Sequence, residues 1–268
     1  VIDSLPPILS VHSGDYHILL LANDSTLWGL GFNGKGQLGL GDKKYRKIPK
    51  RIRVGKITQV ACGGEHSLIQ DESGRIWGSG DNFWGQLGVG LTRDKKKSFY
   101  RLPKLRNVLK ICCGSKHSVF LTHEGEVLTA GCNSRGMLGI GRSDVLLKRY
   151  PVRIRSLQNI RDISCSGQVT MCLDGEGQVF RFGSNEKISP LPGYRYDCEP
   201  PKLIEEIPPI CILSQGSASL VSVLKAREGT IYTFGNNSLF KMPPQLDPTL
   251  NHIVGPCCSN QHVKSARK

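Results

Sequence analysis

The sequence lacks long apolar segments and the short motifs of common enzymes. Its longest apolar run is near residues 18–22, whereas a membrane-spanning helix needs about 20 apolar residues. No Gly-x-Ser-x-Gly, His-Glu-x-x-His or Gly-x-x-x-x-Gly-Lys-Ser/Thr segment occurs, which excludes the usual signatures of serine hydrolases, zinc peptidases and phosphate-binding loops. We therefore expect no catalytic residue, no metal and no cofactor.

Cysteine pairs with metal-binding spacing are also missing, although the chain has 10 cysteines. No Cys-x-x-Cys occurs, and adjacent pairs such as Cys112 and Cys113 do not suit a tetrahedral metal site. By sequence, two positions of a repeat hold cysteine: Cys62, Cys113 and Cys258 at one, and Cys112, Cys165 and Cys257 at the position before it. We predict free, buried thiols rather than disulfides, and hence a reducing compartment such as the cytoplasm or nucleus.

A repeat of about 50 residues is the main feature that the chain does have. A short strand ends in glycine at Gly31, Gly80, Gly131, Gly183 and Gly235, with spacings of 49, 51, 52 and 52 residues. A Gly-x-x-His segment precedes this strand at 14–17, 63–66 and 114–117, and Gly-x-Leu-Gly-x-Gly follows it at 36–41, 85–90 and 136–141. Three markers in fixed phase predict a repeated structural unit.

Each unit is typical of a small antiparallel sheet. The 31 glycines and 15 prolines favour short strands and tight turns, and the 3.6-residue periodicity of a helical solenoid is not found. A lone sheet of three or four strands cannot bury both faces, but sheets stacked around an axis can. We predict an all-β propeller, one domain over residues 1–268, with repeats at 9–56, 57–107, 108–159, 160–209 and 210–251 and a partial sixth at 252–268.

These markers resemble the repeat of the regulator-of-chromosome-condensation family. The resemblance rests on Gly-x-x-His, on the strand ending in Trp-Gly-x-Gly, and on Asn-x-x-Gly-Gln-Leu-Gly-x-Gly at 33–41 and 82–90. It is strong over residues 10–160 and weaker beyond them. The family commonly forms seven blades. Five full repeats, two of them without Gly-x-Leu-Gly-x-Gly, favour a smaller or incompletely closed ring, or a truncated chain.

The resemblance implies a regulator of a Ran-like small GTPase, acting as a guanine-nucleotide exchange factor or activator through protein contact. Such a factor needs no nucleophile or metal, so whether the protein counts as an enzyme stays open. Some members of the family are bacterial effectors in the host cytoplasm, which is a further possible setting. In the Ran exchange factor, acidic and histidine residues of the Gly-x-x-His segment line the face that meets the GTPase. The matching positions are Asp15, His17, Glu65, His66, Lys116 and His117. Alternatively, the histidines bond backbone carbonyls and hold the blades in register.

Basic residues are concentrated in one phase of the repeat. The formal net charge is +14, and the basic runs at 42–56, 91–110 and 142–161 all follow Gly-x-Leu-Gly-x-Gly. Because the three runs hold the same position in the repeat, we predict that they form one basic arc on adjacent blades. The residues of the predicted docking patch are Lys43, Lys44, Arg46, Lys47, Arg93, Lys95, Lys96, Lys97, Lys148 and Arg149.

Two interpretations of this arc stay open. The basic runs are either solvated loops that aid solubility, or a docking surface for an acidic protein, for nucleic acid such as chromatin, or for an anionic membrane. The second interpretation gives the alternative function, a non-catalytic propeller scaffold. In either case we expect a monomer.

Overall fold

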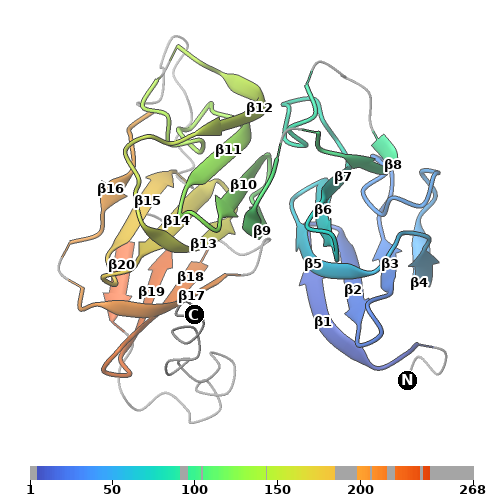
Figure 1. Cartoon of the computed structure of the whole chain (residues 1–268), viewed down its shortest axis with the longest axis horizontal. Helices are drawn as coiled ribbons and strands as arrows, with labels where there is room; N and C mark the ends of the chain where they lie inside the picture. Colours follow the sequence, from blue (N-terminus) through green and yellow to red (C-terminus); the bar gives the residue numbers. More distant parts are fainter. Residues whose placement is uncertain are drawn as a thin grey trace, which may run out of the picture.

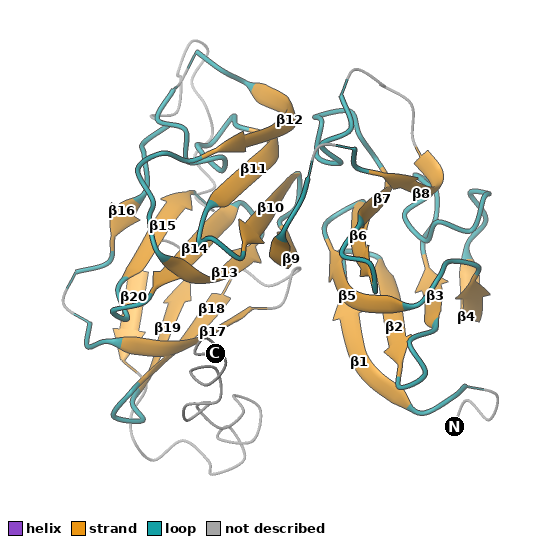
Figure 2. Ribbon diagram, viewed as in Figure 1, coloured by secondary structure: helices purple, strands orange, loops and turns teal. Residues whose placement is uncertain are grey.

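The protein is an arc of antiparallel β-sheets (Figure 1). The structure is a computed structural model that describes residues 5–90, 96–103, 105–142, 144–184, 198–205, 207–215, 221–235 and 238–241. These residues form five sheets of four strands each and no helix (Figure 2). In the same ranges there is no helix long and apolar enough to cross a membrane. The predicted all-β fold is confirmed.

Within each sheet the strands pair in sequence order. Their bounds are, in sheet 1, β1 (Ile8–Ser13), β2 (His17–Ala22), β3 (Leu27–Gly31) and β4 (Arg46–Ile52); in sheet 2, β5 (Ile57–Cys62), β6 (His66–Asp71), β7 (Ile76–Gly80) and β8 (Lys96–Arg101); in sheet 3, β9 (Val108–Cys113), β10 (His117–Thr122), β11 (Val127–Cys132) and β12 (Leu147–Arg153); in sheet 4, β13 (Ile160–Ser166), β14 (Val169–Asp174), β15 (Val179–Gly183) and β16 (Lys202–Leu203); and in sheet 5, β17 (Ile210–Gln215), β18 (Val221–Ala226), β19 (Ile231–Gly235) and β20 (Ser238–Lys241).

The first strand of every sheet lies innermost. Strand β1 contacts β5, β5 contacts β9, β9 contacts β13, and β13 contacts β17. A central cavity of about 310 Å³ is lined by residues 11–13, 60–62, 110–113, 163–165 and 213–214, which come from all five first strands. Sheets that share an axis in this way form a propeller. The partial sixth repeat at 252–268 lies outside the described residues.

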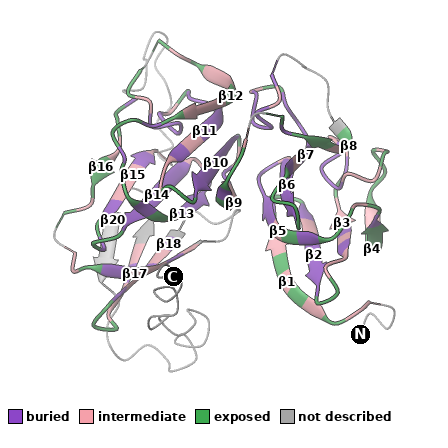
Figure 3. Ribbon diagram, in the orientation of Figure 1, coloured by how far each residue is buried: buried purple, intermediate pink, exposed green. Residues whose placement is uncertain are grey.

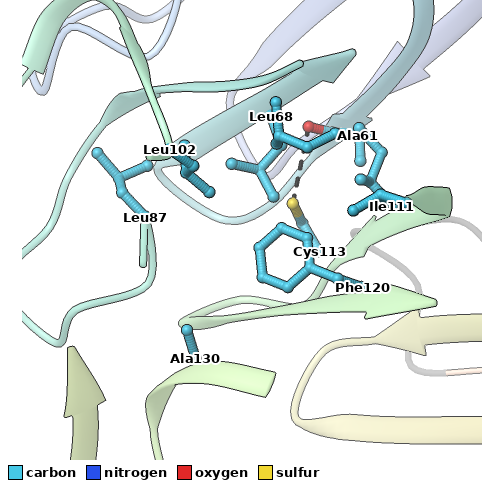
Figure 4. Close-up of a cluster of buried hydrophobic side chains, with 10 residues drawn as sticks. Ala61, Leu68, Leu87, Leu102, Ile111, Cys113, Phe120 and Ala130 are labelled. Atoms are coloured by element: carbon cyan, nitrogen blue, oxygen red, sulfur yellow. Dashed lines mark hydrogen bonds between the residues drawn. The ribbon is translucent and has the colours of Figure 1, made fainter. Parts of the chain in front are cut away.

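The hydrophobic core lies between neighbouring sheets. Between sheets 2 and 3, Leu68 and Leu87 lie on one side of the core, and Ile111 and Phe120 on the other (Figure 4). Similar clusters fill the other boundaries. Because a second strand has a neighbouring sheet on both faces, every residue of β6, β10 and β14 is buried (Figure 3).

The Gly-x-Leu-Gly-x-Gly segments are here called latches, and the first two tie their sheets to the next. Leu38 of the first latch packs in sheet 1, while the Gly41 N–H donates to the Lys97 carbonyl on β8 at 2.8 Å. The next latch repeats this bond with Arg149 on β12 at 2.9 Å. Glycine is required at Gly39 because φ is +65° and a Cβ would collide with the ring of Phe99.

One face of sheet 1 is not covered by the described residues. Val11 pairs with Leu20 at the register position that Val60, Ile111 and Ile163 hold in the next three sheets. The exposed fraction of Val11 is 64%, against 6%, 5% and 0% for those residues. The interface that buries this position elsewhere is therefore open on sheet 1.

Strand register corrects one sequence alignment of the cysteines. Cys165 pairs with Thr170, as Cys62 pairs with Ser67 and Cys113 with Ser118. It therefore shares the position of Cys62 and Cys113, and the prediction that it shares the position of Cys112 is wrong. The reason is that Gly167 is not the counterpart of Gly114: strand register aligns Ser166 with Gly114 and Gly167 with Ser115, so this glycine stands one residue later in sheet 4.

The predicted free thiols are only partly confirmed. Five cysteines are buried and form no disulfide: Cys62, Cys113, Cys132, Cys172 and Cys198. Cys112 and Cys165, however, form a disulfide between sheets 3 and 4, so the thiol argument for a reducing compartment does not extend to this pair. Neighbouring sheets bring the two cysteines together because they lie on facing sides of one boundary. Cys257 and Cys258 lie outside the described residues.

Candidate functional site

The three histidines of the Gly-x-x-His segments are joints between sheets. Each imidazole is at most 1% exposed, and its Nε2 is hydrogen-bonded to a hydroxyl on the second strand of the next sheet. The pairs are His17–Ser67 at 2.8 Å, His66–Ser118 at 3.0 Å and His117–Thr170 at 2.8 Å. The partners are hydroxyls rather than backbone carbonyls, but the joints hold neighbouring sheets in register.

Burial also keeps these imidazoles neutral. It lowers the pKa of His17 and of His117 to about 4, and that of His66 to about 3, where the nearby His117 and His17 add to the effect. An enclosed, neutral imidazole offers no atom to a docked protein. The structure therefore does not place the three histidines on a contact face, and it favours their structural interpretation.

The residues just before each histidine lie on the surface instead. Asp15 and Lys116 are exposed, and the Glu65 side chain is 38% exposed. These three residues come from three different sheets, yet all line one hollow of about 440 Å³. The repeat brings them together because equal phase places the three turns at the same end of the propeller. The hollow thus contains the predicted acidic and basic positions without the histidines.

Aromatic side chains form much of the remaining wall of the hollow. Tyr16, Phe83 and Trp84 line it, and Tyr16 and Phe83 are well exposed. Phe83 meets Trp84 edge to face, with ring centroids 5.0 Å apart. Sequence reasoning missed Phe83 and Trp84 because they lie between Asn82 and Gly85, in a segment that we interpreted as architecture. The signal was two large aromatic residues at its variable positions.

Charges of both signs line the hollow. The Lys35 ammonium lies 3.4 Å from the Glu65 carboxylate, and the Lys116 ammonium lies 5.5 Å from the centre of the Trp84 ring. Burial, and then the charge of Glu65, raise the pKa of Asp15. Exposed aromatic rings are typical of the centre of protein–protein interfaces, and charged side chains beside them are typical of the polar rim. Among the described residues, no group of three or more His, Cys, Asp or Glu side chains is suited to hold a metal.

The predicted basic arc lies on the outermost strands. Lys43 and Lys44 are exposed just before β4. The other described members are Arg46 and Lys47 on β4, Lys96 and Lys97 on β8, and Lys148 and Arg149 on β12. The described members of the patch thus lie on strands or just before one, and charges there also discourage edge-to-edge pairing with another sheet. Arg46 is paired with Asp42. Arg93 and Lys95 lie outside the described residues, and the docking role of the arc stays a prediction.

A family model matches three consecutive segments of the chain. The model described as "Regulator of chromosome condensation (RCC1) repeat" matches residues 24–70, 73–121 and 124–173, which is more than half of the chain. A second model of the same description matches residues 57–86 and 108–136.

Curated relatives match over parts of much longer proteins. The chain is 30% identical over 205 residues to the ultraviolet-B receptor UVR8 of Arabidopsis thaliana, which is 75% of this chain and 46% of UVR8. It is 30% identical over 134 residues to the human E3 ubiquitin-protein ligase HERC2, covering 48% of this chain and 3% of HERC2. The chain therefore spans less than half the length of either relative.

Solved structures share the fold. Human WBSCR16 superposes with a TM-score of 0.75 at 21% identity, covering 90% of this chain and 68% of WBSCR16. Prp20p of Saccharomyces cerevisiae, whose structure was described together with its binding to Gsp1p and histones, superposes with a TM-score of 0.67 at 19% identity, covering 89% of this chain and 77% of Prp20p. Both likenesses support the propeller.

Proposed function

Because the chain belongs to the regulator-of-chromosome-condensation (RCC1) repeat family, we propose that it is a protein-binding propeller that regulates a small GTPase of the Ran type. The partner docks at the hollow between the turns of the first three sheets. The observation that carries this proposal is the convergence of Asp15, Glu65 and Lys116 with three aromatic side chains in that hollow. The described binding of Prp20p to Gsp1p and histones supports the class of partner.

The hollow supplies what a nucleotide-exchange factor needs. Such a factor lowers the affinity of the GTPase for its nucleotide by binding the nucleotide-free form more tightly, so contact energy replaces chemistry. Tyr16 and Phe83 offer exposed apolar area for this contact. Asp15 and Lys116 offer both signs of charge, which fix the orientation of the partner.

Release of fluorescent GDP from a panel of small GTPases, Ran included, tests the proposal. We expect the protein to accelerate release from at least one of them, and Tyr16→Ala to remove most of that acceleration. Tyr45→Ala is the matched control, because Tyr45 is also an exposed tyrosine but lies beside β4, outside the hollow. The proposal is wrong if no GTPase responds, or if Tyr16→Ala is as active as the parent.

The second candidate function is the non-catalytic scaffold. It is favoured by the common position of the three basic runs on β4, β8 and β12, the outermost strands of adjacent sheets. Charge reversal at two exposed members, Lys47→Glu with Lys97→Glu, should weaken binding to DNA, and added salt should weaken binding of the parent. Unchanged binding of DNA would count against this candidate.

A further inference from the structure

A second recess lies at the rim of the propeller, away from the hollow. It is a groove of about 430 Å³ between sheets 1 and 2. Its floor is the first latch, with Gly39, Leu40 and Gly41, and one wall is Ser98 and Phe99 of β8. The other wall is the end of β4 and the residues after it, Lys50, Arg51, Arg53 and Val54.

The lining of the groove is cationic. Lys50, Arg51 and Arg53 are exposed, and no carboxylate lines the groove. Within the described part of the chain, none of these three residues takes part in an ion pair. Arg51 interacts with the exposed Asp24, whose pKa is lowered mainly by hydrogen bonds with Thr26 and to a smaller extent by the charge of Arg51.

The floor of the groove is held in place before any ligand arrives. The Gly41 N–H bonds the Lys97 carbonyl at 2.8 Å, and Leu40 forms a β-bridge with Ser98. The latch therefore acts as an extra strand on β8. The Val54 N–H donates to the Ile52 carbonyl at 3.0 Å and fixes the chain just after β4. A recess with a fixed backbone loses little ordering entropy on binding.

The architecture of the repeat does not require this set of cations. Strand register places Tyr100, Arg101 and Pro103 of sheet 2 at the positions of Lys50, Arg51 and Arg53. In sheet 3 the positions hold Val152, Arg153 and Arg155, and Arg153 is paired with Glu126. Among these three sheets, only sheet 1 thus has three cationic residues without an ion pair at these positions.

We propose that this groove binds a ligand that carries two or more phosphate groups. Guanidinium groups bind phosphate oxygens in pairs and an ammonium adds a point charge, while Ser98 offers a hydroxyl to the same ligand. A recess of a few hundred cubic ångströms has the size of a small-molecule site. The same chemistry exists in a soluble polyphosphate and in the headgroup of a phosphorylated lipid. The proposal is independent of the GTPase, because the groove and the hollow share no residue.

Titration calorimetry with inositol hexakisphosphate, and co-sedimentation with phosphatidylcholine vesicles that contain phosphatidylinositol bisphosphate, test the proposal. We expect Lys50→Gln with Arg53→Gln to weaken binding about tenfold or more. The matched control is Arg106→Gln with Arg155→Gln, which removes the same charge from exposed positions, and Arg155 is the counterpart of Arg53 in sheet 3. The control should bind within about twofold of the parent.

Each outcome decides the proposal. Binding of the soluble probe alone identifies a soluble ligand. Vesicle binding that the soluble probe displaces identifies a lipid headgroup. If neither probe binds, or if both double variants lose the same affinity, the groove is not the site and the proposal is wrong. Binding of DNA without binding of either probe overturns it in favour of nucleic acid. All four positions are exposed, and thermal unfolding of the variants confirms that they fold.

Discussion

Nε2 of His66 lies 3.0 Å from the hydroxyl of Ser118, across the boundary between sheets 2 and 3. The same hydroxyl donates to the carbonyl of Gln86, in the latch of sheet 2, at 2.6 Å. Through this one buried serine, sheet 3 thus contacts both the Gly-x-x-His segment and the latch of sheet 2. Ser67 makes the same two contacts one sheet earlier, with His17 and Gln37.

Removing this hydroxyl should destabilise the propeller. Ser118→Ala leaves two buried polar atoms without their partner, and we expect a loss of about 1–3 kcal/mol in the free energy of unfolding. Ser118→Thr should cost much less, because Thr170 holds the equivalent position in sheet 4. Urea unfolding measures both. An alanine variant as stable as the parent would show that the joint contributes nothing.

The free energy of unfolding should decrease as the pH is lowered, because the buried histidines resist protonation. Their pKa values in the folded protein are about 4, 3 and 4 for His17, His66 and His117, below the value of about 6.5 in the unfolded chain. Below pH 6.5 the unfolded state takes up protons that the folded state does not. The stability present above pH 6.5 is therefore lost progressively as pH falls towards 4, by up to about 1.4 kcal/mol per pH unit for each histidine.

Urea midpoints measured at intervals between pH 7.5 and pH 4.5 check this dependence. His66→Gln should make the slope shallower, because it removes one of the three groups. A midpoint that does not change with pH over this interval would contradict the buried, neutral state of the histidines.

Glycine in the latch should be intolerant of a side chain. Gly39→Ala puts a Cβ against Phe99 at a φ of +65°, and we expect a loss of about 2 kcal/mol or more. Gly55→Ala is the control, because a Cβ there meets nothing within 4 Å. Thermal unfolding of the two variants separates the latch effect from the general cost of replacing glycine. Equal stability of both would contradict the close approach of latch and β8.

The open face of sheet 1 gives a paired test. Val60→Ala removes two buried methyl groups and should cost about 2 kcal/mol, whereas Val11→Ala at the equivalent exposed position should change stability by less than about 0.5 kcal/mol. Urea unfolding compares the two. A loss for Val11→Ala as large as for Val60→Ala would mean that another element covers this face and that the ring is closed.

The sequence predicts the propeller well because the residues that recur in the repeat are the ones that the fold requires. Gly39 and His66 have counterparts in the first three repeats because a close backbone approach and a buried hydrogen bond recur there. The same periodicity predicts that Asp15, Glu65 and Lys116 converge, and that the basic runs share one rim. Both predictions follow from the equal position of these residues in successive repeats.

What the sequence does not predict depends on side-chain direction and on the shift of a single marker residue. Gly-x-x-His does not reveal that the histidine turns inward while the preceding residue faces out. Phe83 and Trp84 stand at positions without a periodic constraint, so no pattern indicated the aromatic wall of the hollow. The prediction for Cys165 is wrong because Gly167, the glycine used to align sheet 4, stands one residue later than the counterpart of Gly114.

The joints between sheets all point the same way along the chain. The histidine and the latch of one sheet bond the sheet that follows, as His17 and Gly41 bond residues of sheet 2. During synthesis, then, a sheet that has left the ribosome still lacks the partners of its own joints until roughly one more repeat has emerged. While the first three repeats are being made, the nascent protein therefore has one unfinished apolar surface at its growing end, and a pause in translation within a repeat would leave that surface open to aggregation.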